Sequence, residues 1–205
     1  MAPGKLCSSP PALFAPWKTV SAGAAVGPPR RGVGWAGPGP AGRGFGRIAH
    51  MAALHQLPLG FSRVADGVYR SAYPGTRTLP FLSSLNLRSL VCLNPKDVRS
   101  ELRDYAKQQS LRLFEGDVGV NQEPFLVMSS FEVDSVLRFV SDPTNHPVLI
   151  FCTNGKVRTG TVVGCLRKQM GWSIVSIFHE LEQATDGDAT LADQLFIEQF
   201  LPMSD

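Results

Sequence analysis

Short apolar runs alternate with longer amphipathic stretches along the chain after residue 60. The runs at 68–70, 88–93, 111–115 and 148–151 predict strands, because they have strand length and are bounded by turn-forming residues. The stretch 98–109 is rich in helix formers, and 130–141 carries apolar residues at mostly helical spacing. Strands that alternate with helices predict an α/β domain whose central, mainly parallel sheet is flanked by helices.

Two further helices are predicted near the end of the chain. Ser173 is a plausible N-cap for the first of them. Its apolar face would carry Ile174, Ile177, Phe178 and Leu181. The last helix would carry Leu191, Leu195, Phe196 and Phe200.

Residues 1–60 are predicted to be a disordered leader, and 61–205 the folded domain. The first 50 residues contain 10 Gly and 8 Pro, which resist regular structure. Seven basic residues and no acidic residue precede Asp66. This composition is typical of an organelle transit peptide, and equally of an extension ahead of a true start at Met51. We therefore expect a cytoplasmic protein, or an organellar one if the leader is a transit peptide.

The charge and the cysteine content exclude several classes of function. Beyond residue 65 the chain has 13 basic and 17 acidic residues, so the basic overall charge belongs to the leader and does not favour nucleic-acid binding. No stretch approaches the ~20 apolar residues of a membrane span. The spacing of Cys7, Cys92, Cys152 and Cys165 fits neither a zinc site nor a disulfide framework. Cys92 and Cys165 lie among apolar residues and are expected in the core.

The candidate chemistry lies directly after the strand at 148–151. Five residues separate Cys152 from Arg158, and a run compatible with a helix, TVVGCLRK, follows Gly160. A short loop that opens a helix turns successive backbone N–H groups toward a bound phosphate. We therefore predict a phosphate-binding loop composed of Thr153, Asn154, Gly155, Lys156, Val157, Arg158 and Thr159.

Each residue type in this loop has a chemical reason. Gly155 allows close approach of the backbone to the ligand, and the planar guanidinium of Arg158 can hold two phosphate oxygens. The same donors favour the thiolate of Cys152 at neutral pH. That thiolate would attack the phosphate and form a phosphocysteine, which water then hydrolyses. Thr159 can donate a hydrogen bond to the departing sulfur, and the scheme requires neither metal nor cofactor.

The chain resembles the plant and fungal atypical dual-specificity phosphatases, a group that includes inositol pyrophosphate phosphatases. The resemblance runs from about Phe61 to Phe200. It rests on GVYRSAYP (67–74), LNLRSLVCL (85–93), LRLFEGDVGVNQEPF (111–125), NHPVLIFCTNGKVRTGTVVGCLRK (145–168), Gly171-Trp172 and DQLFIEQF (193–200). It implies the compact α/β fold of cysteine-dependent phosphatases.

The chain departs from the family pattern around the nucleophile. Active members usually have His where Phe151 stands, and that His helps to hold the loop. They also carry more basic residues in the loop, at Thr153, Asn154 and Val157, while Lys156 is retained. Near the C-terminus they carry Lys and Arg where Asp188 and Thr190 stand. These departures weaken the case for a highly anionic substrate, because each missing cation removes a charge-assisted contact.

Two residues are candidates for the general acid. Asp117 lies in the loop where the superfamily often places one, and Glu123 in NQEPF matches the resembled family. A tyrosine leaving group, with a pKa of about 10, needs such a donor. A phosphate leaving from a pyrophosphate needs little help, because its second pKa is about 6. An exposed structural role stays open for both residues.

The sequence therefore predicts a phosphatase whose substrate is an inositol pyrophosphate or a phosphoprotein such as phosphotyrosine. The nucleophile Cys152 favours an enzyme, because a protein that only binds phosphate does not need it. The alternative is a catalytically weak phosphate-binding module that acts as a regulatory partner, which the missing His and loop bases favour. No nucleic-acid partner is expected.

Overall fold

The computed structural model describes residues 56–123, 125 and 128–202. The predicted leader, up to residue 55, lies outside these residues. The backbone of Leu59 already contacts the sheet, where its carbonyl accepts a hydrogen bond from the Ala72 N–H at 2.7 Å. Within the described part of the chain, no helix is long and apolar enough to cross a membrane.

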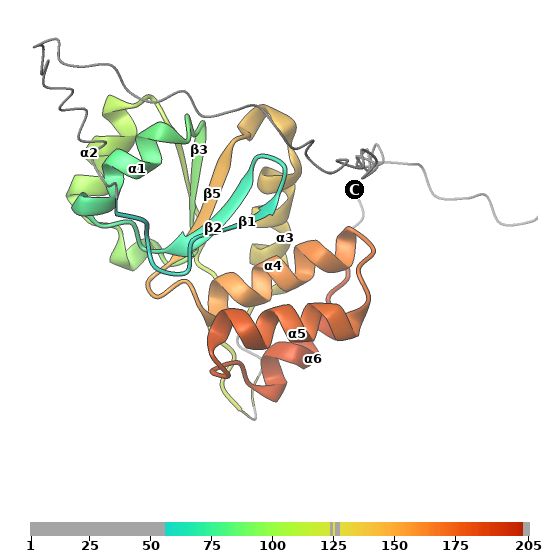
Figure 1. Cartoon of the computed structure of the whole chain (residues 1–205). Helices are drawn as coiled ribbons and strands as arrows, with labels where there is room; N and C mark the ends of the chain where they lie inside the picture. The colour runs from blue at the N-terminus through green and yellow to red at the C-terminus, as the bar shows by residue number, and fades with distance from the viewer. Residues whose placement is uncertain (1–55, 124, 126–127, 203–205) are drawn as a thin grey trace, which may run out of the picture. The chain divides into compact units, whose positions relative to one another are not determined.

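A five-stranded sheet forms the centre of the fold (Figure 1). Its strands are β1 (Ser62–Ala65), β2 (Val68–Ala72), β3 (Ser89–Cys92), β4 (Arg112–Glu115) and β5 (Val148–Cys152). Their spatial order is β1-β2-β5-β3-β4, and only β1 runs antiparallel to its neighbour. Every residue of β3 and β5 is buried, as expected for the inner strands of a covered parallel sheet. The predicted α/β fold with a mainly parallel sheet is confirmed.

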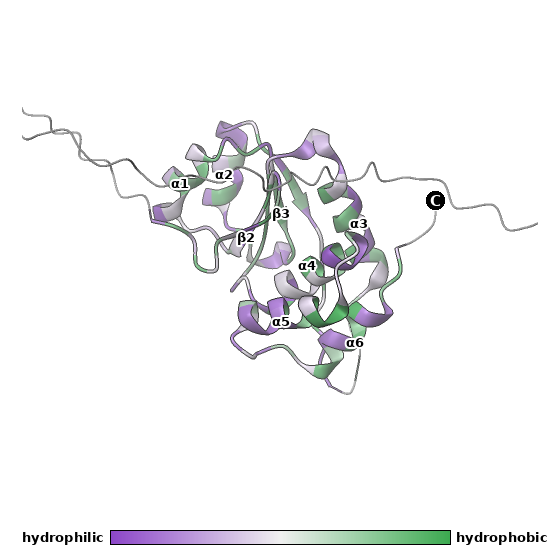
Figure 2. Ribbon diagram, turned by 45° about the vertical axis from the view of Figure 1, so that its right-hand side comes forward, coloured by the Kyte–Doolittle hydropathy of each residue, from purple (hydrophilic) through white to green (hydrophobic). Residues whose placement is uncertain are grey.

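Helices cover both faces of this sheet (Figure 1). They are α1 (Leu79–Ser84), α2 (Ser100–Gln108), α3 (Ser130–Ser141), α4 (Val157–Gln169), α5 (Ile174–Thr185) and α6 (Leu191–Gln199). Three short 3-10 turns, Thr76–Thr78, Pro95–Asp97 and Pro143–Asn145, lie in the connections. Apolar residues of the helices pack against the sheet and against one another. Figure 2 shows the hydropathy of each residue along the ribbon.

The alternation of side chains along β5 divides the core into two parts. Leu149 and Phe151 pack with residues of α1 and α2 on one face. Ile150 and Cys152 pack with residues of α3, α4, α5 and α6 on the other. Successive residues of a strand point to opposite faces, so the nucleophile and Phe151 face different cores.

Several predicted elements match the structure closely. The helix α3 has the predicted bounds, and Ser173 caps α5 by accepting the Ser176 N–H at 3.2 Å. Cys92 and Cys165 are buried in the core, as predicted. The strand β1 and the short helix α1 were not predicted. The helix α4 begins at Val157, so it starts inside the predicted loop rather than after Gly160.

The predicted apolar face of α6 was partly wrong. Leu191 and Leu195 are 62% and 37% exposed, whereas Phe196 and the unpredicted Ile197 are buried. The reason is a close approach to α4, where a Cβ on Gly164 would lie 2.5 Å from the Ile197 side chain. Because of that contact, Ile197 faces the core in place of the predicted Leu195.

Candidate active site

The predicted loop lies at the carboxyl end of β5. Thr153 to Lys156 connect β5 to α4, and Val157 to Thr159 form the first turn of that helix. The backbone at Cys152 pairs with Ala72 of β2, and the carbonyl of Thr153 accepts the Tyr73 N–H at 3.3 Å. Cys152 is 1% exposed. The carboxyl edge of a parallel sheet is where ligands bind in this fold class.

Gly155 is required by both its conformation and its surroundings. Its φ is +70°, which lies in the left-handed region that favours glycine. A Cβ at this position would lie 2.4 Å from the backbone nitrogen of Ala72 and 2.7 Å from its Cα. The loop is therefore packed directly on the end of β2.

The first turn of α4 presents two polar side chains to the loop. Thr159 is fully buried and Arg158 is half-buried. The Nε of Arg158 and the Oγ1 of Thr159 are buried and have no hydrogen-bond partner among the described residues. Both can donate, and they lie at the positive end of a helix dipole. This combination suits an anion with several oxygens.

Asn154 connects the nucleophile to the turn of the loop. Its Oδ1 lies 3.7 Å from the Cys152 Sγ and accepts the Lys156 N–H at 3.2 Å. Such a side chain-to-backbone contact two residues on closes a tight turn locally. Thr153 and Asn154 are exposed, so both face solvent at the mouth of the site.

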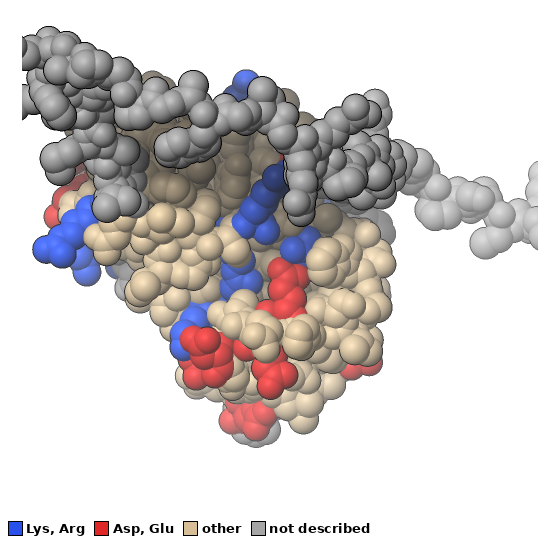
Figure 3. Space-filling view, viewed as in Figure 1, with Lys and Arg blue, Asp and Glu red and all other residues tan. Residues whose placement is uncertain are grey.

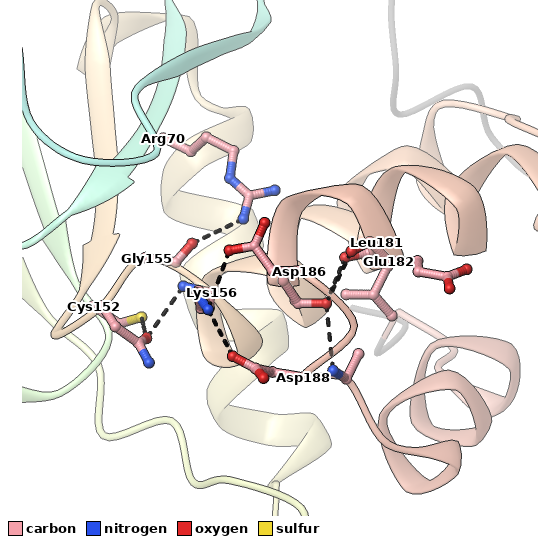
Figure 4. Close-up of polar contacts among 11 residues, drawn as sticks. Arg70, Cys152, Gly155, Lys156, Leu181, Glu182, Asp186 and Asp188 are labelled. Carbon is pink, nitrogen blue, oxygen red and sulfur yellow. Dashed lines mark hydrogen bonds and ion pairs between the residues drawn. The ribbon is translucent and has the colours of Figure 1, made fainter.

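Lys156, the basic residue that the loop retains, is paired with two carboxylates. Its Nζ lies 2.7 Å from Asp188 and 3.2 Å from Asp186, both in the connection between α5 and α6 (Figure 4). Hydrogen bonds to Asp188 and Asp186 raise the pKa of the Lys156 ammonium group. Basic and acidic side chains also lie next to one another on the face shown in Figure 3. The positive charge at the mouth is therefore partly neutralised by the protein itself.

The two candidates for the general acid differ in their surroundings. Asp117 is exposed, in a segment that continues along the carboxyl edge of the sheet, where the Gly116 and Val118 N–H groups donate to the carbonyls of Cys92 and Leu93. Glu123 instead accepts the Leu191 N–H at 3.2 Å, at the N-terminus of α6. Its carboxylate has a structural contact, so Asp117 remains our prediction for the acid.

Phe151, which stands where the resembled family has His, is fully buried. Its ring packs edge-on against Tyr73, with centroids 5.8 Å apart. The surrounding core also contains Leu90, Cys92 and Leu149. The side chain at position 151 therefore makes no hydrogen bond to the loop.

Two buried polar residues escaped the sequence analysis. Arg70 is 3% exposed in β2, and its Nη2 donates to the Gly155 carbonyl at 3.0 Å. Asn121 is also buried, and its amide group bridges the Met128 N–H and the Asp193 carboxylate, which ties the segment after β4 to α6. For Arg70, the available signal was an arginine inside a predicted strand, because a charge that becomes buried there requires a nearby partner.

Metal-ligand geometry is a separate question from the phosphate loop. Across the residues described, no group of three or more His, Cys, Asp and Glu side chains is arranged to hold a metal ion.

Comparison with known proteins identifies the family. The model of the tyrosine phosphatase family matches residues 57–203. The inositol diphosphatase DSP1 of rice (Oryza sativa subsp. japonica) is 41% identical over 143 residues, which are 70% of this chain and 64% of the rice protein. A probable tyrosine-protein phosphatase, DG1060 of Dictyostelium discoideum, is 37% identical over 148 residues, which are 72% of this chain and 89% of that protein.

A solved structure shows the same fold. The core catalytic domain of the Saccharomyces cerevisiae PP-IP phosphatase SIW14, in complex with citrate, superposes with a TM-score of 0.67 at 33% identity. The match covers 71% of this chain and 88% of the yeast domain. The predicted resemblance is thereby confirmed, and the chain belongs to the tyrosine phosphatase family.

Proposed function

We propose that the protein is a phosphatase that works through a phosphocysteine at Cys152. The Sγ thiolate attacks phosphorus, the S–P bond forms, and the P–O bond to the leaving group breaks with its electrons. Water then attacks the phosphocysteine, releasing inorganic phosphate and the thiolate. The observation that carries this proposal is the pair of buried donors on Arg158 and Thr159, in the part of the loop that forms the first turn of α4.

Each loop residue has a role in this scheme. The fork of Arg158 and the N–H groups of the loop, apart from that of Lys156, which donates to Asn154, bind the phosphate oxygens and stabilise the charge that develops on them. Thr159 donates to the sulfur as it leaves. Asp117 protonates a poor leaving group such as tyrosine.

An inositol pyrophosphate is the substrate that we propose first. The names of the rice and yeast relatives support it, since both are described as acting on inositol diphosphates or pyrophosphates. The chemistry supports it too, because a phosphate leaving group with a second pKa of about 6 departs with little acid catalysis. The exposure of Asp117 to solvent is then no obstacle.

The state of Lys156 favours a second candidate, a simple phosphomonoester such as phosphotyrosine. Its ion pairs with Asp186 and Asp188 partly neutralise the loop cation that would otherwise bind a crowded polyphosphate. The name of the Dictyostelium relative points to a tyrosine phosphatase. A phosphomonoester carries only about two charges and needs fewer cations.

Hydrolysis of an inositol pyrophosphate and of an aryl phosphate by the purified chain tests these proposals. We expect vanadate to inhibit both reactions and Cys152→Ser to abolish them. Asp188→Asn should raise kcat/KM for the inositol pyrophosphate by roughly threefold, with less effect on the aryl phosphate. Asp104→Asn, an exposed change on α2, controls for net charge. Vanadate binding without turnover of either substrate would instead support the regulatory phosphate-binding module.

A further inference from the structure

Arg70 is a buried charge inside the strand next to the nucleophile. Its neighbours Val68, Ser71 and Ala72 are also buried, and Arg70 itself is 3% exposed. A buried guanidinium is costly unless its hydrogen bonds and charge are matched. The contact that matches it is long-range, from Nη2 to the carbonyl of Gly155, 85 residues along the chain (Figure 4).

This contact fixes the orientation of one peptide group of the loop, the one between Gly155 and Lys156. In a trans peptide the C=O and the following N–H point in opposite directions. Because the Gly155 carbonyl is turned toward Arg70, the Lys156 N–H is turned away from it. That N–H meets the Asn154 Oδ1, the same atom that lies 3.7 Å from the Cys152 Sγ. The guanidinium therefore holds the peptide group between Gly155 and Lys156, whose N–H donates to the Asn154 side chain beside Cys152.

Arg70 also interacts electrostatically with Cys152, because its strand β2 is paired with β5. Burial lowers the pKa of the Arg70 guanidinium, while the negative charges of Glu180 and Cys152 act to raise it. An arginine nevertheless stays protonated in proteins. In general, a cation close to a cysteine favours the thiolate over the thiol.

The ring of Phe151 cannot provide this support, because it has no hydrogen-bonding group. It faces the core under α1 and α2, whereas Cys152 belongs to the core on the opposite face, with α4 and α5. Arg70 extends to this second side, where its Nη2 would lie 3.8 Å from a Cβ on Gly160 of α4.

We propose that Arg70 is a positioning residue, which holds the phosphate loop through the Gly155 carbonyl and stabilises the Cys152 thiolate in the presence of Phe151. The inference rests on the proposed function, because it assigns Arg70 a task in the same site. It adds a cation from a separate strand to the loop donors already considered.

The other charged groups around the loop define the control. Glu180 of α5 and Arg167 of α4 lie close enough to Arg70 to affect its pKa. The remaining charges are Arg158 of α4, Lys156 with Asp186 and Asp188, and Asp117 of the segment after β4. Arg167 is 7% exposed, pairs with Glu180 at 2.8 Å and donates to the Val64 carbonyl at 2.7 Å. It is a buried arginine like Arg70 without a hydrogen bond to the loop.

The test measures the alkylation rate of Cys152 with iodoacetamide against pH, in the full chain carrying Cys7→Ser. Mass spectrometry of the peptide that contains Cys152 separates its signal from those of the buried Cys92 and Cys165. Burial raises the pKa of the Cys165 thiol far above its ordinary value, which keeps it unreactive. The variants are Arg70→Met, Arg70→Lys and, as control, Arg167→Met.

We expect the midpoint of the alkylation profile to move up by about one pH unit in Arg70→Met. Arg70→Lys keeps a charge, so its midpoint should lie between those of Arg70→Met and wild type. Arg167→Met should lower the melting temperature and leave the midpoint within about 0.3 pH unit of wild type. If Arg70→Met does not fold, the comparison of Arg70→Lys with wild type carries the test.

The outcomes separate this inference from the proposed function. A low wild-type midpoint that is unchanged in a folded Arg70 variant would overturn the role of Arg70 alone. A wild-type midpoint at the value of an ordinary thiol, about 8.5, would overturn the nucleophile and with it the proposed function. An equal shift in Arg167→Met would show a general effect of core damage and overturn the specific role of Arg70.

Discussion

Gly155→Ala is the substitution whose effect the structure predicts most sharply. Gly155 has a φ of +70°, and a Cβ there would lie 2.4 Å from the Ala72 nitrogen. The obstructing atoms belong to the backbone of β2, which cannot rotate away like a side chain. The substitution therefore perturbs the phosphate loop at the point where it contacts the sheet.

The substitution has two effects at this position, one on stability and one on the geometry of the loop. Placing alanine in the left-handed region costs about 1 kcal/mol. Relief of the steric overlap requires a shift of roughly 1 Å, because ordinary Cβ contacts begin near 3.4 Å. A misplacement of about 1 Å in a catalytic site can cost about 100-fold in rate. We therefore expect kcat/KM to fall by about two orders of magnitude.

Gly171→Ala separates the two effects. Gly171 has a φ of +80°, and its Cβ would meet nothing within 4 Å. This variant should lose about 1 kcal/mol of stability and keep its kcat/KM. Steady-state hydrolysis of an aryl phosphate, with urea unfolding of both variants, measures the difference. A Gly155→Ala protein with kcat/KM within threefold of wild type would refute the reasoning about loop packing.

Other predictions concern the nucleophile, its neighbour and the leader. Cys152→Ser should abolish turnover and retain phosphate binding and folding. Arg158→Lys should also lose turnover, because a point charge cannot replace the planar fork of the guanidinium. Vanadate binding and steady-state kinetics measure both variants, and an active Cys152→Ser protein would contradict the mechanism. Phe151→His should move the acidic limb of the rate profile to lower pH. It should also lower the free energy of unfolding by about 2 kcal/mol, because it places a polar ring in an apolar core. An unchanged acidic limb would show that position 151 does not support the thiolate. A chain that begins at Met51 should keep the melting temperature and activity of the full chain, whereas a large drop in calorimetry would show that the leader packs on the domain.

Local patterns in the sequence determined most of the elements and the chemistry of the site. The apolar run before Cys152 predicted β5, and the spacing to Arg158 predicted an anion-binding loop. Periodicity predicted the bounds of α3, and Ser173 predicted the start of α5. Each of these signals depends on residues only a few positions apart, which short-range sterics and hydrogen bonds control.

The tertiary structure decided the contacts that tune this loop. Arg70 meets the Gly155 carbonyl only because β2 pairs with β5, and Lys156 meets Asp186 and Asp188 only because α5 packs beside α4. The buried face of α6 likewise followed from its contact with Gly164. Such choices depend on which elements become neighbours after long loops close, and no local pattern of residues contains that information.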